Sequence, residues 1–319
     1  MWTSSQYEAF AANFDAFANY TNTLGVFVGN EVIARANQSE VAPFIKAATR
    51  DMKAYRDSKG MRKIPVGYSA ADIAELRPML QNYLACGNNT DDTVDFFGLN
   101  AYEWCNPKDT FEISGYKTLN EMTEGYPVPI FFSETGCNTN RPRLFLDQAA
   151  ILGPQMNDIW SGTIVYEWIE ETNNYGLISY AEPVAKTMTG ENIHDGFVRK
   201  GTPTPVQPDF SNLANVWKTL TPKGVPSSEY TPDVTAPPCP TYEKGGWQVD
   251  GDVPLPTINQ ELTIVATIVS SSTSAGAAAA TTTEEVATST SAGAAVSNGQ
   301  LIGVSGGLVS LLLGVIAWL

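Results

Sequence analysis

Short apolar runs alternate with helical patterns over the first half of this chain. The runs are rich in β-branched and aromatic residues, and they occupy 24–31, 64–68, 96–100, 130–134 and 162–168. Such runs predict buried parallel strands. Apolar residues at helical spacing predict helices over 7–17, 41–59, 73–83, 116–124 and 142–156. Ser5–Glu8 has the form of a capping box and is expected to start the first helix.

Strict alternation over five strands is typical of a parallel α/β architecture. A complete (β/α)₈ TIM barrel needs eight strands and about 250 residues, so five strands predict only part of one. The chain then becomes irregular and rich in proline, with one further helix expected over 210–220.

The C-terminal part differs in composition from the rest. Ser, Thr, Ala and Gly dominate from residue 258 onward, above all in 270–293, which is typical of a disordered, O-glycosylated stalk. The uncharged apolar stretch Leu301–Leu319 follows the small residues Ser297–Gly299. This order predicts a GPI-attachment signal. A transmembrane helix is the alternative; the GPI signal is favoured because no Lys or Arg follows the apolar stretch.

Charge and composition exclude several classes of function. The chain of 319 residues has 34 Asp and Glu against 19 Lys and Arg, a net charge of −15, which argues against nucleic acid and anionic membrane surfaces as partners. His194 is the single histidine, so multi-histidine metal sites are excluded and a Ser-His-Asp triad would require His194. The four cysteines lack CxxC spacing, which argues against zinc. We expect neither a metal nor a cofactor.

Evidence on the cellular compartment points in two directions. Sequons at Asn19, Asn37 and Asn88, an even number of cysteines and the C-terminal stretch favour a secreted protein with two disulfides. Met1–Ser5 has neither the basic segment nor the apolar stretch of a signal peptide. The protein is therefore either cytosolic or its sequence begins too late, and we favour the second interpretation.

Two predicted strands end in a glutamate, and these are the candidate catalysts. Glu31 follows Gly29 and Asn30, whereas Glu134 follows Ile130–Ser133. A single glutamate after a strand is more often a solvated loop residue. Two of them at the carboxyl ends of barrel strands, where such folds carry their chemistry, predict a glycosidase. A separation of about 5 Å would make the enzyme retaining, with one carboxylate as nucleophile and the other as acid/base.

Several stretches resemble a known family in order along the chain. They are Val28–Val32, Gly98–Cys105, Phe131–Asn138, Tyr166–Trp168 and Asn174–Leu177. Together they resemble the fungal β-1,3-glucanosyltransferases of glycoside hydrolase family 72, over residues 1 to about 245. Such enzymes are GPI-anchored on the outer face of the cell membrane and in the cell wall. They cut β-1,3-glucan internally and transfer the new reducing end to the non-reducing end of another glucan chain.

The resemblance implies roles for individual residues. Glu31 is similar to the family's acid/base and Glu134 to its nucleophile. The implied substrate-binding residues are Asn30 at the sugar 2-hydroxyl, Tyr102 and Tyr166 on the donor side, Asp72 and Arg77 on the acceptor side, and Tyr175 as a stacking or positioning residue. Packing at the barrel rim is the alternative for each tyrosine, and helix capping is the alternative for Asp72.

The resemblance also implies disulfides and a division into domains. It implies bridges Cys105–Cys137 and Cys86–Cys239. Residues 1–245 would form the catalytic domain, holding strands 4–8 of the barrel, before a linker over 246–298 and the anchor signal over 299–319. The family's signal peptide and its first three strand–helix units have no counterpart in this sequence. We therefore expect that the gene model is incomplete and that its true start lies upstream of Met1. The partners would be glucan donor and acceptor chains, bound by a monomer. An endo-β-1,3-glucanase and an inactive wall glycoprotein are the alternatives.

Overall fold

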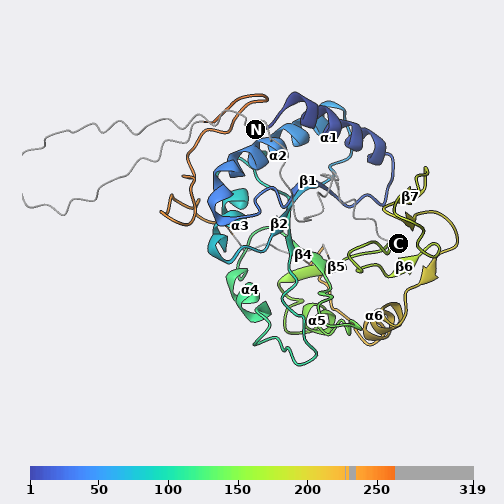
Figure 1. Cartoon of the computed structure of the whole chain (residues 1–319). Coiled ribbons are helices and arrows are strands. Elements are labelled where there is room, and N and C mark those ends of the chain that lie inside the picture. The colour runs from blue at the N-terminus through green and yellow to red at the C-terminus, as the bar shows by residue number, and fades with distance from the viewer. Residues whose placement is uncertain (227, 230–234, 263–319) are drawn as a thin grey trace, which may run out of the picture. The chain divides into compact units, whose positions relative to one another are not determined.

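A five-stranded parallel sheet forms the centre of the protein (Figure 1). The computed structural model describes residues 1–226, 228–229 and 235–262. Neighbours in the sheet follow chain order, β1-β2-β3-β4-β5. The strands are β1 (Val26–Asn30), β2 (Val66–Ala71), β3 (Phe96–Asn100), β4 (Ile130–Thr135) and β5 (Trp160–Val165). The parallel α/β architecture predicted from the sequence is confirmed, and all of its strand carboxyl ends lie at one edge of the sheet.

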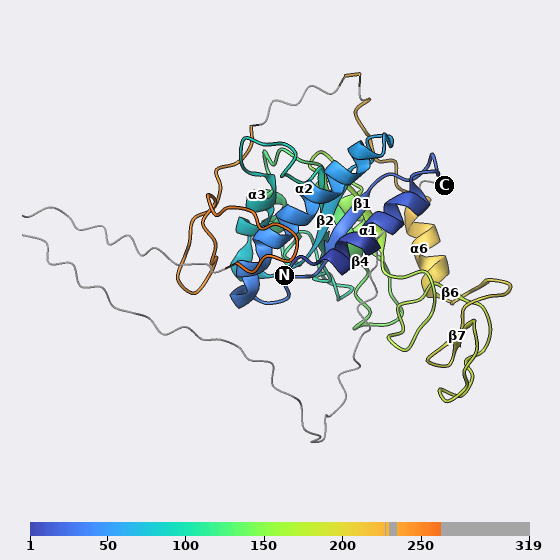
Figure 2. The ribbon, with the colours of Figure 1, turned by 90° about the horizontal axis from the view of Figure 1, so that it is seen from above.

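Helices before, between and after the strands cover one face of the sheet, as the two ribbon views show (Figures 1 and 2). They are α1 (Ser4–Phe17), α2 (Ala42–Ser58), α3 (Met79–Ala85), α4 (Tyr116–Met122), α5 (Asp147–Ile151) and α6 (Asp209–Trp217), with 3₁₀ turns at Ala36–Val41 and Ala74–Leu76. The capping box of α1 is formed by Thr3 and Gln6, two residues before the expected position.

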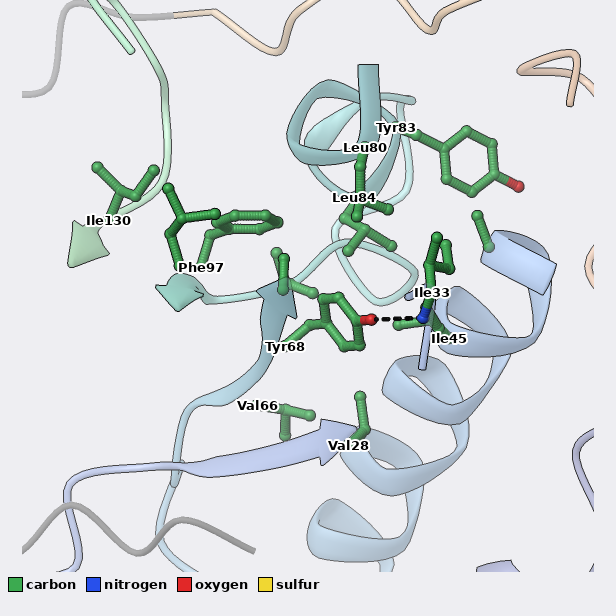
Figure 3. Packing of buried hydrophobic residues seen from close by; sticks show 14 of the residues in the cluster. Val28, Ile33, Ile45, Val66, Tyr68, Leu80, Tyr83, Leu84, Phe97 and Ile130 are labelled. Carbon is green, nitrogen blue, oxygen red and sulfur yellow. Dashed lines mark hydrogen bonds between the residues drawn. The ribbon is translucent and has the colours of Figure 1, made fainter. Parts of the chain in front are cut away.

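The hydrophobic core lies between the sheet and these helices. Alternate strand residues such as Val28, Val66 and Tyr68 point toward α2 and α3, where they meet Ile45 and Leu84 (Figure 3). The fully buried Tyr68 hydroxyl accepts a hydrogen bond from the backbone N–H of Ile33 at 3.3 Å, so its polar atom is paired. The core therefore fixes the backbone just beyond the end of β1.

The opposite face of the sheet has two layers. Rings of Phe27, Phe96 and Phe131 gather near the amino ends of the strands, with centroids 5.2 to 6.2 Å apart. Nearer the carboxyl ends, polar side chains replace them, namely Ser69, Asn100 and Ser133, which are joined by hydrogen bonds. The candidate site lies on this polar layer.

Two predicted helices are shorter than expected, and prolines and glycines explain why. The helix expected over 73–83 is split, because Arg77 precedes Pro78 and adopts an extended conformation. The helix expected over 142–156 is reduced to α5, and turns follow it from Leu152 through Gly153 and Pro154.

Beyond β5 the chain forms two small antiparallel sheets that the sequence did not predict. They pair β6 (Ile178–Ser179) with β9 (Thr204–Pro205), and β7 (Ile193–His194) with β8 (Phe197–Val198). Strands of two residues carry too little apolar periodicity to be recognised.

The packed unit extends past the expected domain boundary at residue 245. Trp247 and Val249 are fully buried, and Val253, Leu255 and Ile258 pack against the same core. Residues 247–258 therefore belong to the folded unit and not to the linker. Residues 263–298 of the expected linker and the anchor signal over 299–319 lie outside the described residues. Within the described ranges, no helix combines the length and apolar composition that a membrane crossing requires.

Candidate active site

Glu31 stands immediately after β1. Its backbone N–H donates to the Ser69 carbonyl at 2.9 Å, and its side chain is exposed. Its φ of 50° is left-handed, a conformation that costs a non-glycine residue about 1 kcal/mol or more and is concentrated at functional sites. The Glu31 Oε1 atom accepts a hydrogen bond from Asn100 Nδ2 at 2.9 Å. The Glu31 carboxylate is thus held against the carboxyl end of β3 by Asn100 and does not point freely into solvent.

Glu134 lies three strands away in the sheet order, near the end of β4. Its side chain is half-buried, and its Oε2 accepts a 2.6 Å hydrogen bond from the Tyr102 hydroxyl. Burial raises the pKa of the Glu134 carboxyl above its usual value, and the negative charges of Glu31 and Glu167 add to this. The Tyr102 hydrogen bond acts in the opposite direction and lowers that pKa. The two glutamates are therefore close enough to interact electrostatically.

Asn30 and Asn100 connect the ends of β1 and β3. Asn30 Oδ1 accepts from Asn100 Nδ2 at 3.0 Å, beside the bond from the same nitrogen to Glu31. Asn100 is only 3% exposed. Sequence reasoning missed Asn100 as a site residue, although its place at the carboxyl end of a predicted strand was a usable signal.

Three tyrosines implied by the resemblance come together beside Glu134. The ring centroids of Tyr102, Tyr166 and Tyr175 lie 5.3 to 6.4 Å apart, all in edge-to-face geometry. Such contacts hold the rings in fixed orientations. Burial raises the pKa of Tyr102, so its hydroxyl remains a proton donor to Glu134.

Arg143 holds the backbone of two of these tyrosines, Tyr166 and Tyr175, and this role was not predicted from the sequence. Its guanidinium is buried, donates to the backbone carbonyls of Tyr166 at 2.9 Å and Tyr175 at 2.6 Å, and pairs with buried Asp209 at 2.8 Å. The sequence offered no signal for this pair, because Asp209 lies on α6, far along the chain.

Asp72 and Arg77 form an ion cluster with a third residue, Glu103. The Arg77 guanidinium contacts Asp72 through Nε at 2.5 Å and reaches Glu103 Oε1 at 2.8 Å. The capping alternative for Asp72 is wrong, because Ile73 is the N-cap of the following 3₁₀ turn and no side chain caps it. No hydrogen bond between described residues joins this cluster to Glu31 or Glu134, so its acceptor-side role stays a prediction.

Both implied disulfides are present. Cys105–Cys137 joins the loops after β3 and β4, directly beyond Tyr102 and Glu134, and Cys86–Cys239 joins the end of α3 to the C-terminal segment. The first bridge therefore links the two loops that follow the nucleophile candidate and its hydrogen-bond donor. Across the described residues, no three His, Cys, Asp or Glu side chains gather as metal ligands would.

The matching family model covers most of the folded unit. The model described as glucanosyltransferase, glycoside hydrolase family 72, matches residues 1–195. The chain belongs to glycoside hydrolase family 72. The resemblance inferred from the motifs is thereby confirmed, and the matched range includes Glu31, Glu134 and every candidate substrate-binding residue.

Fungal members of family 72 are similar to the chain at the sequence level. The 1,3-beta-glucanosyltransferase gel1 of Aspergillus fumigatus is 40% identical over 248 residues, which make up 77% of this chain and 49% of that protein. The 1,3-beta-glucanosyltransferase gas2 of Schizosaccharomyces pombe is 37% identical over 256 residues, 79% of this chain and 52% of that protein. The chain thus spans about half the length of the curated relatives it matches.

A solved structure agrees with these sequence matches. Saccharomyces cerevisiae Gas2p in complex with laminaritriose and laminaritetraose has a TM-score of 0.69 and 36% identity, covering 81% of this chain and 54% of that one. The described fold is therefore that of the matching half of a family 72 protein.

Proposed function

We propose that the chain is a β-1,3-glucanosyltransferase that acts with retention of anomeric configuration. The observation that carries this proposal is the pair Glu31 and Glu134 at the carboxyl ends of β1 and β4, on the same edge of the sheet, each carboxylate held by its own donor, Asn100 or Tyr102. The activity for which the relatives are named and the laminari-oligosaccharides in the Gas2p complex support β-1,3-glucan as the substrate class.

The proposed reaction has two displacements. Glu134 attacks the anomeric carbon and forms a covalent glycosyl-enzyme, while Glu31 transfers its proton to the oxygen of the leaving glucan. Glu31, now a carboxylate, then removes the proton from a hydroxyl of the acceptor glucan, and that oxygen displaces Glu134. A β-1,3 bond is broken and a β-1,3 bond is formed, so no cofactor is required.

The surroundings of the two glutamates support this division of roles. The Tyr102 hydroxyl donates to Glu134 and so favours the ionised form that a nucleophile needs. Glu31 is exposed and can exchange its proton with a leaving group, an acceptor or water. Asn30 would contact the sugar 2-hydroxyl, a contact that strengthens in the transition state.

The tyrosine cluster and the ion cluster are assigned to opposite sides of the scissile bond. Tyr102, Tyr166 and Tyr175 would line the donor side, where their fixed rings offer apolar faces to sugar rings. Asp72 and Arg77 would contact the acceptor glucan, with one carboxylate and one guanidinium as hydrogen-bonding groups. The working unit is taken to be a monomer.

The proposal also covers the complete barrel and the location of the enzyme. The five strands would be strands 4–8 of a (β/α)₈ barrel, in keeping with their parallel order and their outer helices. The stalk and GPI signal expected at the C-terminus would hold the enzyme on the outer face of the cell membrane or in the cell wall.

The deciding experiment incubates the chain with a reduced laminari-oligosaccharide and separates the products by size. Products longer than the substrate are expected, because an acceptor sugar competes with water for the glycosyl-enzyme. Shorter products alone would assign an endo-β-1,3-glucanase. An unchanged substrate would contradict both activities and favour an inactive wall glycoprotein.

A further inference from the structure

Asn100 uses every hydrogen-bonding position of its side chain in the layer beneath the two glutamates. Its Nδ2 donates to Glu31 Oε1 at 2.9 Å and to Asn30 Oδ1 at 3.0 Å. Its Oδ1 accepts from the hydroxyls of Ser69 at 2.9 Å and Ser133 at 2.7 Å. An asparagine amide has two donor protons and two acceptor sites, so its capacity is fully used.

The orientation of this amide follows from the chemistry of its neighbours. A carboxylate only accepts hydrogen bonds, so the Asn100 nitrogen, and not its oxygen, must face ionised Glu31. The serine hydroxyls on the other side can donate, and they lie 2.8 Å from each other. A flipped amide would place its oxygen against the Glu31 carboxylate. The observed arrangement is therefore the one that satisfies all the partners.

The absence of a side chain at Gly98 leaves space for the Ser133 hydroxyl of this network. A Cβ at Gly98 would lie 2.6 Å from Ser133 Oγ, so a side chain there would displace the serine. The phenylalanine rings of Phe27, Phe96 and Phe131 occupy the layer beneath and exclude water from it. Hydrogen bonds in such an environment are stronger than in water, and unpaired polar groups are more costly.

We propose that Asn100 is a positioning residue that holds the Glu31 carboxylate and the Asn30 amide in the geometry required for proton transfer. This inference rests on the proposed function. Glu31 and Asn30 are exposed, and the Asn100 amide is the side-chain partner that the structure describes for both. Ser133, which also contacts Asn100, directly precedes Glu134, so one buried side chain links the β1 end that carries the acid/base to the β4 end that carries the nucleophile.

Other charged groups near Glu31 do not replace this contact. On β2 and β4, Tyr68 and Glu134 are titratable groups whose charges interact with Glu31. The Tyr68 hydroxyl is bonded to the Ile33 backbone, and Glu134 repels Glu31 when both are ionised. Beyond β2, Arg77 is engaged by Asp72 and Glu103. Orientation of the Glu31 carboxylate therefore depends on Asn100.

The test compares two donor substrates in the Asn100→Asp variant. Aspartate keeps the size of the side chain and its acceptors for Ser69 and Ser133, but it presents an oxygen to Glu31 and Asn30. The first donor is a laminari-oligosaccharide, whose leaving oxygen needs a proton. The second is a laminari-oligosaccharyl fluoride, whose fluoride leaves without one. Measured quantities are the initial rate of transfer and the burst of fluoride released as Glu134 is glycosylated.

We expect the transfer rate with the natural donor to fall roughly tenfold to a hundredfold, which is part of the roughly 10²–10⁴-fold that general acid–base catalysis contributes, because Glu31 is misoriented and not removed. The fluoride burst rate should fall less than about threefold, because that step needs no acid. Thr49→Ala is the matched control: it removes a buried hydroxyl bonded to the Ile45 carbonyl at 3.0 Å, and neither rate should change.

Two results would overturn the inference while leaving the proposed function intact. They are an equal loss with both donors, which indicates a purely structural role, and no loss with either. If Asn100→Asp does not fold, the double variant Ser69→Ala/Ser133→Ala decides, with the same selective loss expected at smaller size. An unmodified chain that neither transfers glucan nor releases fluoride would contradict the proposed function, and the inference would fall with it.

Discussion

The ends of β1–β4 and the segment that follows β5 form the two sides of the candidate site, and they are held in different ways. At the ends of β1–β4, side chains of different strands bond directly to one another, as Asn100 on β3 does with Ser69 on β2 and with Glu31 after β1. After β5, the backbone of residues 166–175 is held by Arg143, a buried cation whose partner Asp209 lies on α6.

Because of this difference, we expect substitutions on the first side to affect mainly the reaction and substitutions on the second side to affect mainly the stability of the fold. The first side is made of hydrogen bonds between the ends of β1–β4, worth about 1 kcal/mol net between neutral groups and about 1.5–3 kcal/mol where Glu31 or Glu134 accepts. A change there should alter the reaction more than the fold. The second side depends on a buried charge pair, and removing Arg143 leaves buried Asp209 with only the partly exposed Arg141 as a cationic partner. A change there should lower stability first and activity as a consequence.

The largest effect is expected from the two glutamates themselves. Glu134→Gln should remove the nucleophile and abolish the covalent glycosyl-enzyme, a loss of about 10⁴-fold or more in transfer. Glu31→Gln should slow both displacements, yet the glycosyl-enzyme should still accumulate with an activated fluoride or nitrophenyl donor, which needs no acid. Mass spectrometry of the trapped protein checks both. Labelling of Glu31 in place of Glu134 would reverse the assignment.

The segment after β5 is tested by Arg143→Met. We expect a loss of about 3–5 kcal/mol in the free energy of unfolding, because Asp209 would remain buried and charged. The double variant Arg143→Met/Asp209→Asn should recover part of this loss, and the coupling between the two sites can be measured from denaturant melts.

Arg141→Met provides the control for this prediction. Arg141 also contacts Asp209, at 3.0 Å, but its side chain is 36% exposed, so its removal should cost no more than about 1 kcal/mol. Equal losses for Arg141→Met and Arg143→Met would contradict the view that burial of the charge decides the effect.

The same contrast explains how much could be predicted from the sequence. Strands, their order and the placement of Glu31 and Glu134 follow from apolar runs that each end in a polar residue, and parallel strands bring such ends together. The phenylalanine layer and the polar layer lie on the face of the sheet opposite the helices, and their shared face also follows from the alternation of side chains along the strands. Local signals were therefore sufficient for the ends of β1–β4.

Contacts between distant segments were not predictable in this way. The Arg143–Asp209 pair joins a loop to α6, and nothing in either segment marks the other as a partner. Burial of Trp247 depends on a tertiary contact with Tyr83, whose ring centroid lies 5.3 Å away, although the surrounding sequence is rich in glycine and proline. Tertiary packing overrode the local composition there.

The smallest of these effects, and the one most specific to the chemistry, is expected from Tyr102→Phe. The variant keeps the ring and its contacts with Tyr166 and Tyr175 but loses the hydroxyl that donates to Glu134. That hydrogen bond lowers the pKa of Glu134, so its loss should raise this pKa further above the usual value. Since the nucleophile must be ionised, the acidic limb of the pH profile of kcat/KM should move to higher pH.

The rate at the pH optimum should fall about tenfold, as expected for a hydrogen bond to a charged group. Tyr166→Phe is the matched control. Its hydroxyl accepts from Asn173 and makes no described hydrogen bond to Glu134, so the acidic limb should stay in place even where the rate falls. A limb that moves equally in both variants would show that the whole tyrosine cluster, through burial, sets the ionisation of Glu134. A limb that moves only in Tyr102→Phe would assign that effect to one hydrogen bond on the β1–β4 side of the site, independent of the Arg143-supported segment.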